Sequence, residues 1–227
     1  MHHVREHRSL LAERERRLLI AIAGRLPHWI NSDHLTLVGL LSMPLAGLAF
    51  AHIPAAPWSA AAFALALAAN WFGDSLDGTL ARVRNQQRPR YGYYVDHVID
   101  LVGTAVLFAG IAWSGLMHPS LAMGVVAAYF LVAAESFLAT HAAGVFRLSF
   151  AGFGPTELRI LLAIGGVVVI NKPWVDVAGH HARLFDVGGI VAVAGMIGAF
   201  TVSAIRNTRA LYLAEPLPSQ AAEREAA

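Results

Sequence analysis

The sequence predicts an all-α, polytopic membrane protein. Of its 227 residues, 56% are hydrophobic and only 14% are charged, which is too apolar for a typical soluble domain. The apolar residues form runs long enough to cross a bilayer as helices, and prolines stand at or near the boundaries between these runs. The chain has no cysteine, so disulfides and thiolate-bound metals are excluded.

Six membrane spans are predicted, and together they form one membrane domain over residues 1–227. The run at 156–172 is the shortest, because Lys172 and Pro173 end it. We expect the bundle to cover 35–208, with a cytoplasmic tail at 209–227. The predicted spans are 35–53, 57–81, 92–115, 119–143, 156–172 and 186–208.

The segment 1–30 predicts an amphipathic helix, from Arg5 to Gly24, on the cytoplasmic membrane surface against anionic lipid. A soluble capping helix is the alternative. The apolar run within segment 1–30 is too short for a signal peptide. Ser32 or Asp33 can cap the first span. The expected apolar side of the surface helix holds Leu10, Leu11, Leu18 and Ile22.

The distribution of basic residues predicts the orientation. Segment 1–34 holds six arginines and the link after the second span holds four, whereas the opposite-side loops hold only Lys172 and Arg183. Positively charged loops stay in the cytoplasm. We therefore expect both termini on the cytoplasmic side of a bacterial-type inner or plasma membrane, and no nucleic-acid partner.

Four carboxylates, Asp74, Asp77, Asp96 and Asp100, lie within apolar sequence. Each pair is three or four residues apart, which puts its two members on one helix face. The link between the pairs is short, so the two helices are expected to be antiparallel neighbours. Counting from the link at about 1.5 Å per residue puts Asp77 level with Asp96 and Asp74 level with Asp100. Such a box suits two Mg²⁺ or Mn²⁺ ions about 4 Å apart. Four solvated residues at a hairpin tip are the alternative.

These residues carry a resemblance. The pattern Asp-x-x-Asp-Gly-x-x-Ala-Arg, followed by Gly-x-x-x-Asp-x-x-x-Asp, resembles the signature of the CDP-alcohol phosphotransferase family, also called the CDP-alcohol phosphatidyltransferase family. The resemblance implies a homodimeric membrane transferase of phospholipid synthesis, which joins CDP-diacylglycerol to an alcohol and releases CMP. The aminoalcohol branch, which joins CDP-choline or CDP-ethanolamine to diacylglycerol, is the alternative. The matching positions are Asp74, Asp77, Gly78, Ala81, Arg82, Gly92, Asp96 and Asp100.

The resemblance also implies roles for these residues. Asp100 corresponds to the general base, and Asp74, Asp77 and Asp96 are the principal metal ligands, with Asp100 also within reach of metal. Small side chains let cytidine approach the second span, and an arginine can bind a phosphate. The implied nucleotide-binding set is Asp74, Gly78, Ala81, Arg82 and Gly92.

Four arginines near cytoplasmic span ends are candidates for an anion pocket that binds a phosphorylated acceptor. Ordinary topology anchors are the alternative. These arginines are Arg147, Arg159, Arg206 and Arg209.

Three further features leave alternatives open. Glu135 lies within the fourth span, and it either has a functional role or has its hydrogen bonds supplied by Ser136, Thr140 and His141. Glu157 fits a helix start. Acidic residues inside spans could also belong to a divalent-cation transporter, although an arginine at the mouth argues against a cation path. Packing glycines are expected at Gly165, Gly166, Gly188, Gly189, Gly195 and Gly198.

Overall fold

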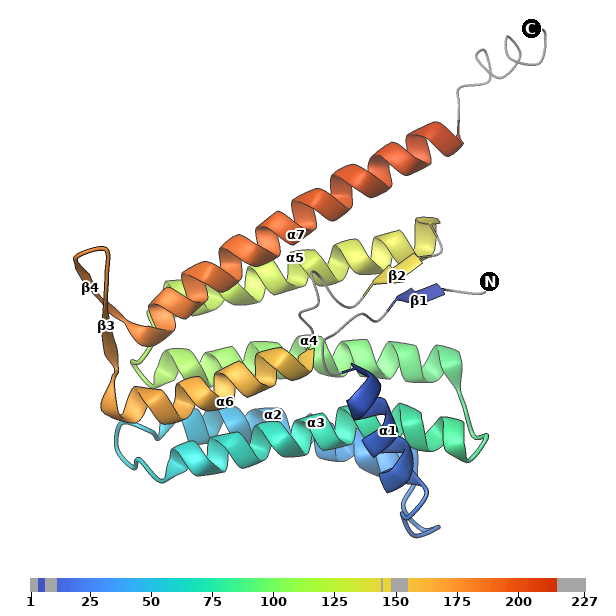
Figure 1. The fold of residues 1–227 in the computed structure, drawn as a ribbon, viewed down its shortest axis with the longest axis horizontal. Helices are drawn as coiled ribbons and strands as arrows, with labels where there is room; N and C mark the ends of the chain where they lie inside the picture. Colours follow the sequence, from blue (N-terminus) through green and yellow to red (C-terminus); the bar gives the residue numbers. More distant parts are fainter. Residues whose placement is uncertain (1–3, 7–11, 144, 148–154, 216–227) are drawn as a thin grey trace, which may run out of the picture.

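The computed structural model describes residues 4–6, 12–143, 145–147 and 155–215. Six long helices form an elongated bundle, and the shorter α1 lies across it (Figure 1). Helix α2 packs against both α3 and α4, α5 packs against α7, and α6 packs against α3. The helices are α1 Ala12–Ala23, α2 Ser32–Ala51, α3 Ser59–Val83, α4 Pro89–Trp113, α5 Pro119–Ala143, α6 Pro155–Asn171 and α7 Leu184–Ala214.

Four short strands complete the described secondary structure. Strands β1, Val4–Glu6, and β2, Val145–Arg147, pair in parallel. Strands β3, Trp174–Val177, and β4, His180–Arg183, form an antiparallel hairpin between α6 and α7. The hairpin turns through Ala178 and Gly179, both at positive φ, as a two-residue turn of this hand requires.

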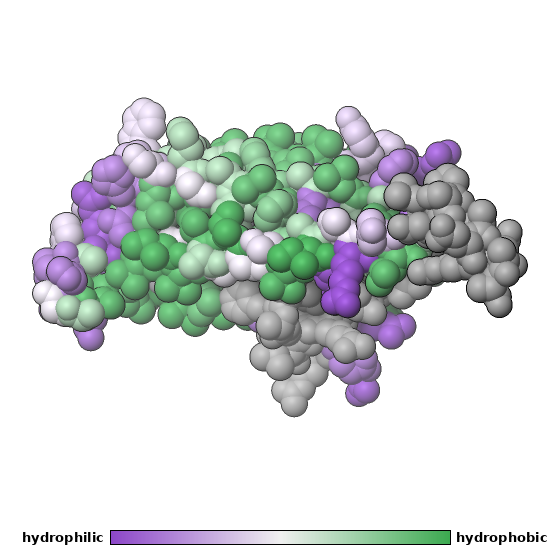
Figure 2. Space-filling view, turned by 90° about the horizontal axis from the view of Figure 1, so that it is seen from above, coloured by the Kyte–Doolittle hydropathy of each residue, from purple (hydrophilic) through white to green (hydrophobic). Residues whose placement is uncertain are grey.

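Each of the six predicted spans coincides with one long helix, with ends that differ by a few residues. Among the described helices, four are long and apolar enough to cross a membrane: α2, α4, α5 and α7. Helix α3 carries Asp74, Asp77 and Arg82, and α6 has only 17 residues. Figure 2 shows apolar side chains across the middle of the molecule and polar ones towards its ends. The protein is thus an all-helical membrane protein, and the count of six spans remains a prediction.

Two glycine contacts bring α3 and α4 onto α2. A Cβ on Gly73 would lie 2.5 Å from the backbone oxygen of Leu35 and 2.5 Å from the nitrogen of Gly39, and a Cβ on Gly110 would lie 2.3 Å from the oxygen of Gly47. Only glycine permits backbones this close. Helices α3 and α4 therefore each pack mainly on α2, and the expected contact between them is confined to side chains such as the carboxylates of Asp74, Asp96 and Asp100.

The prediction of packing glycines is only partly confirmed. Gly165 and Gly166 lie against Phe185 and Phe63, and Gly189 lies against Met117. Among the described residues, no atom outside the local helix lies within 4 Å of a Cβ built on the other three, so they do not mediate a close helix contact there. Those three are Gly188, Gly195 and Gly198.

Helix α1 packs against α3. Leu19 and Ala23 are buried against Leu76 and Leu80, whereas Leu18, expected on the apolar side, is 51% exposed. Ile22, also expected on the apolar side, does pack against this cluster, so the contacting face includes Ile22 but not Leu18. Leu10 and Leu11 lie outside the described residues, as does the side chain of Arg5.

The start of α2 also differs from the prediction. Its N-cap is Asn31, whose side chain accepts from the His34 N–H at 3.0 Å, while the His34 ring accepts from the Asn31 N–H. This reciprocal pair caps the helix at Asn31, one residue before Ser32, where the helix begins. The Ser32 hydroxyl instead donates to the backbone oxygen of Asp77, which fixes α2 to α3.

Candidate active site

Three of the four predicted aspartates converge. One carboxylate oxygen from each of Asp74, Asp96 and Asp100 lies within 4.8 Å of the others. Asp74 comes from α3, and the other two come from successive turns of α4. All three are half-buried. Because oxygen ligands suit Mg²⁺ and Mn²⁺, this group fits a divalent cation.

Asp77 points to a different partner. Its Oδ2 accepts from the Thr36 hydroxyl of α2 at 2.7 Å, and its Oδ1 accepts from the Gly78 N–H. Among the described residues it lies outside the group of three. Its role as a metal ligand stays a prediction.

Arg159 of α6 contacts the cluster directly. Its Nη2 donates to Asp74 Oδ2 at 2.6 Å, and its Nε donates to Asn70 Oδ1 at 2.8 Å. We expected this arginine to bind an acceptor, and the structure pairs it with a predicted metal ligand. The sequence analysis missed Asn70, although a polar residue one turn before Asp74 on the same helix face was a usable signal.

The predicted nucleotide-binding residues lie at the ends of α3 and α4. The Arg82 guanidinium lies beside Gly78, where a Cβ would be 3.3 Å from Arg82 Nη1. Its Nη2 also donates to the Thr79 hydroxyl at 3.0 Å. Gly92 faces open space within the described structure, and Ala81 is half-buried. A larger side chain at Gly78 would therefore displace the Arg82 guanidinium.

Comparison with known proteins identifies the family. The family model for CDP-alcohol phosphatidyltransferases matches residues 29–203, well over half of the chain. The chain belongs to this family. A solved structure with a similar fold is the phosphatidylinositol phosphate synthase of Mycobacterium tuberculosis with CDP-DAG bound, at 18% identity and a TM-score of 0.58. The match covers 86% of this chain and 94% of that one. A search of curated proteins found no significant match.

A CDP-alcohol phosphatidyltransferase is a membrane transferase, so the recognition from the signature is confirmed and the transporter alternative is set aside. The match begins at residue 29, before α2, and ends within α7. It therefore includes all eight signature positions and Arg159, whereas α1 lies outside it.

A second set of side chains missed by sequence analysis ties α1 to this phosphatidyltransferase site. Glu15 accepts from Trp71 Nε1 at 2.7 Å and from the Thr156 hydroxyl at 3.0 Å, and the Ser75 hydroxyl is 3.4 Å away. Trp71 and Ser75 flank Asp74 on α3, and Thr156 precedes Arg159 by one turn of α6. Glu15 thus joins three helices next to the cluster.

Two other predicted acceptor arginines lie on α7, away from the cluster. Arg206 and Arg209 are exposed on α7, whose main neighbour is α5. Arg147 is in strand β2, and its side chain lies outside the described structure. Of the four, only Arg159 contacts an aspartate of the signature among the described residues.

Glu135 is satisfied within the bundle. It is 9% exposed and accepts from the Ser203 hydroxyl at 2.8 Å and from Asn207 Nδ2 at 2.7 Å. Both donors come from α7, whereas the sequence analysis had offered residues of its own helix as partners. Thr140, one of those residues, instead donates to the backbone oxygen of Ser136. Glu157 lies in the first turn of α6, as predicted.

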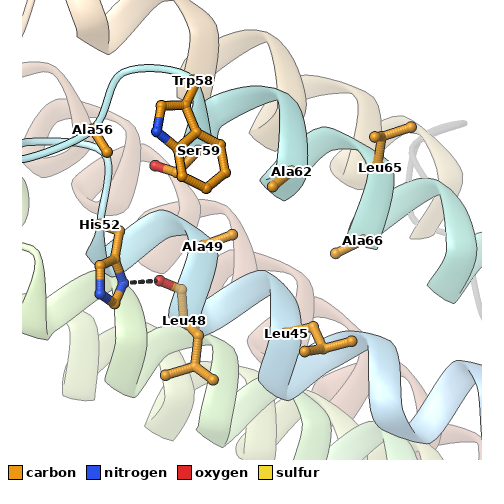
Figure 3. A pocket seen from close by; sticks show the side chains of 10 residues that line it. All are labelled: Leu45, Leu48, Ala49, His52, Ala56, Trp58, Ser59, Ala62, Leu65 and Ala66. Atoms are coloured by element: carbon orange, nitrogen blue, oxygen red, sulfur yellow. Dashed lines mark hydrogen bonds between the residues drawn. The ribbon is translucent and has the colours of Figure 1, made fainter.

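An apolar groove lies between α2 and α3, away from the cluster (Figure 3). Its volume is about 630 Å³. The lining residue nearest the cluster along α3 is Ala66, eight residues and about 12 Å before Asp74. The groove is therefore remote from the carboxylates. It is lined by Leu45, Leu48, Ala49, His52, Ala56, Trp58, Ser59, Ala62, Leu65 and Ala66.

Proposed function

We propose that this protein transfers the phosphatidyl group of CDP-diacylglycerol to the hydroxyl of an alcohol and releases CMP. The observation that carries this proposal is the convergence of Asp74, Asp96 and Asp100 within 4.8 Å in a member of this family. A lipid donor suits the position of the site, because its tails can stay in the bilayer while its head group reaches the carboxylates. The similar synthase of known structure has CDP-DAG bound.

In this proposal Asp74, Asp77 and Asp96 hold two divalent ions, Mg²⁺ or Mn²⁺, with Asp100 also in reach. Bound cations would neutralise the diphosphate and the charge on departing CMP. Asp100 takes the proton of the acceptor hydroxyl as general base. The acceptor oxygen then bonds to the lipid phosphorus, and the bond from that phosphorus to the CMP oxygen breaks.

The nucleotide would lie where α3 and α4 meet their link. The small side chains of Gly78 and Ala81 would let cytidine approach α3, and the exposed Arg82, whose guanidinium lies beside Gly78, would bind a phosphate. Gly92 has open space beside it in the described structure, so it leaves α4 accessible. Asp74 would contact the nucleotide through its metal.

The acceptor we favour is a phosphorylated polyol. Arg159 already lies at the cluster, and Arg147, Arg206 and Arg209 would supply further positive charge. The aminoalcohol alternative would use Glu135 or Glu157 for a cationic head group; Glu135 instead accepts hydrogen bonds from α7, and Glu157 lies in the first turn of α6. We therefore prefer an anionic acceptor.

Two further properties belong to the proposal. The arginine distribution supports cytoplasmic termini and a cytoplasmic site. Family membership supports a homodimer. Labelling of single cysteines introduced at the termini, in intact cells, would test the orientation. Cross-linking in native membrane would test the homodimer.

The test is a CMP-release assay on purified protein with panels of CDP-linked donors and alcohol acceptors. We expect release with CDP-diacylglycerol and one phosphorylated polyol, loss of release in excess chelator, and recovery with Mg²⁺ or Mn²⁺. Full activity in chelator would refute the metal-dependent mechanism. Release with CDP-choline and diacylglycerol alone would move the protein to the aminoalcohol branch.

A further inference from the structure

Three hydrogen bonds in series link helices α2, α3 and α6 beside the carboxylate cluster. Asn70 Nδ2 donates to the backbone oxygen of Gly39 at 3.0 Å. Arg159 Nε donates to Asn70 Oδ1 at 2.8 Å, and Arg159 Nη2 donates to Asp74 Oδ2 at 2.6 Å. The series begins at a backbone atom of α2 and ends on a carboxylate that we expect to bind metal.

The two bonds of Asn70 fix its orientation. The side chain is 3% exposed, and its amide meets a carbonyl oxygen on one side and a guanidinium on the other. Turning the amide over would set its NH₂ against the Arg159 donor and its oxygen against the Gly39 oxygen. The amide therefore has one satisfied orientation, which holds the Arg159 guanidinium at a defined place.

The held guanidinium in turn orients Asp74. A guanidinium is planar and rigid, so fixing Nε also fixes the direction of Nη2. With Asp74 Oδ2 engaged by Arg159, Oδ1 is the oxygen left for a ligand role. Partners of this kind, which orient a metal ligand from behind, typically change metal affinity 10–100-fold.

We propose that Asn70 and Arg159 are positioning residues that hold Asp74 Oδ2 and present Oδ1, with Asp96 and Asp100, to a divalent cation. This inference rests on the proposed metal-dependent function. It assigns a role to Asn70, which lies outside the signature, and it gives Arg159 a second role in addition to the acceptor binding proposed above. The opposing possibility is that Arg159 merely occupies Asp74 and competes with a cation for it.

The two possibilities predict opposite changes in cation affinity when Asn70 or Arg159 is replaced. Mn²⁺ binding to the full-length protein in nanodiscs can be titrated by electron paramagnetic resonance, without nucleotide or acceptor. We expect Asn70→Ala and Arg159→Lys each to weaken Mn²⁺ binding about tenfold. Arg159→Lys keeps the charge but cannot reproduce the two directed bonds. Ser42→Ala, at a buried hydroxyl bonded only within α2, should bind Mn²⁺ as the wild type does.

Kinetics separate positioning from a general loss of structure. At saturating Mn²⁺, Asn70→Ala should keep both substrate KM values within about twofold, while its Mn²⁺ requirement for half-maximal kcat rises about tenfold. If Asn70→Ala does not yield monodisperse protein, Arg159→Lys alone decides by its Mn²⁺ titration.

Unchanged or tighter Mn²⁺ binding in Asn70→Ala or Arg159→Lys would overturn the positioning role, as would a change confined to acceptor KM. Tighter binding in particular would establish competition. A wild-type protein that binds no Mn²⁺ would instead overturn the proposed metal site itself. The two failures are therefore distinguishable.

Discussion

Two helix pairs carry carboxylates inside the apolar bundle, and the surroundings of the carboxylates differ between the two pairs. Between α3 and α4, three aspartates face one another within 4.8 Å. Between α5 and α7, Glu135 faces a hydroxyl and an amide, both of which donate to it. The first arrangement gathers like charges, and the second surrounds one carboxylate with neutral donors.

This difference separates a ligand site from a structural contact. A carboxylate that accepts hydrogen bonds from neutral donors is stabilised without a cation. Carboxylates that face each other repel, and in the described structure Arg159 bonds to the cluster through Asp74, while His97 Nδ1 lies 3.7 Å from Asp96 Oδ2. Asp77 is intermediate, because it accepts from Thr36 and Gly78 yet belongs to the signature. The comparison predicts that chemistry depends on α3 and α4 and that stability depends on Glu135.

The largest effect is expected at Asp100. Asp100→Asn removes the proposed base and should lower kcat by about 10²–10⁴-fold, while much of the nucleotide binding is retained. Stopped CMP-release assays, together with binding of a non-reactive CDP analogue, measure the two quantities. Near-normal turnover in Asp100→Asn would show that Asp100 is not the base.

Asp74→Asn is the companion change within the same cluster. Because Asp74 is proposed to hold metal, this substitution should weaken both turnover and nucleotide binding. The same two assays apply, run over a range of Mg²⁺ concentrations. Nucleotide binding equal to that of the wild type at every Mg²⁺ concentration would remove Asp74 from the proposed ligand set.

A smaller effect is expected at the exposed arginines of α7. If Arg206 binds a phosphate on the acceptor, Arg206→Ala removes a charge-assisted bond worth about 1.5–3 kcal/mol. Acceptor KM should then rise roughly ten- to hundredfold, and donor KM should stay nearly unchanged. Arg206 is a cleaner test than Arg159, whose guanidinium also contacts Asp74.

Arg209→Ala provides the comparison, since Arg209 is also exposed on α7. If both arginines serve only as topology anchors, each substitution should change yield or insertion and leave acceptor KM alone. Unchanged acceptor KM in both variants would confine the anion pocket to Arg159 and Arg147. It would also weaken the preference for a phosphorylated acceptor.

Sequence reasoning succeeded where spacing along one helix decides the answer. The six long helices follow from the apolar runs, and Asp96 and Asp100 share a face because they are four residues apart. The spacing along one helix depends on local geometry alone. Counting residues back from the link correctly placed Asp74 with Asp100, but it also paired Asp96 with Asp77, whereas Asp96 lies with Asp74.

The contacts between helices were less predictable. Close packing of α2 against both α3 and α4 was not predicted, because it depends on the small size of Gly73 and Gly110. The donors to Glu135 were not predicted either, because Ser203 and Asn207 are about 70 residues further along the chain. Periodicity shows which face of a helix is polar, and it does not show which other helix meets that face.

The smallest effect is expected at Glu135, and it should appear in stability. Glu135→Ala leaves Ser203 and Asn207 without their acceptor and should lower the free energy of unfolding by about 1–3 kcal/mol. The kcat of the folded fraction should stay within about twofold, because Glu135 has no role in the proposed chemistry. Thermal unfolding in detergent and CMP release on the same preparation measure both quantities. Ser203→Ala is the matched control, because it removes one of the two donors and should cause a smaller loss of stability. If Glu135→Ala lowered kcat a hundredfold with unchanged stability, the separation between the two helix pairs would fail, and Glu135 would belong to the reaction.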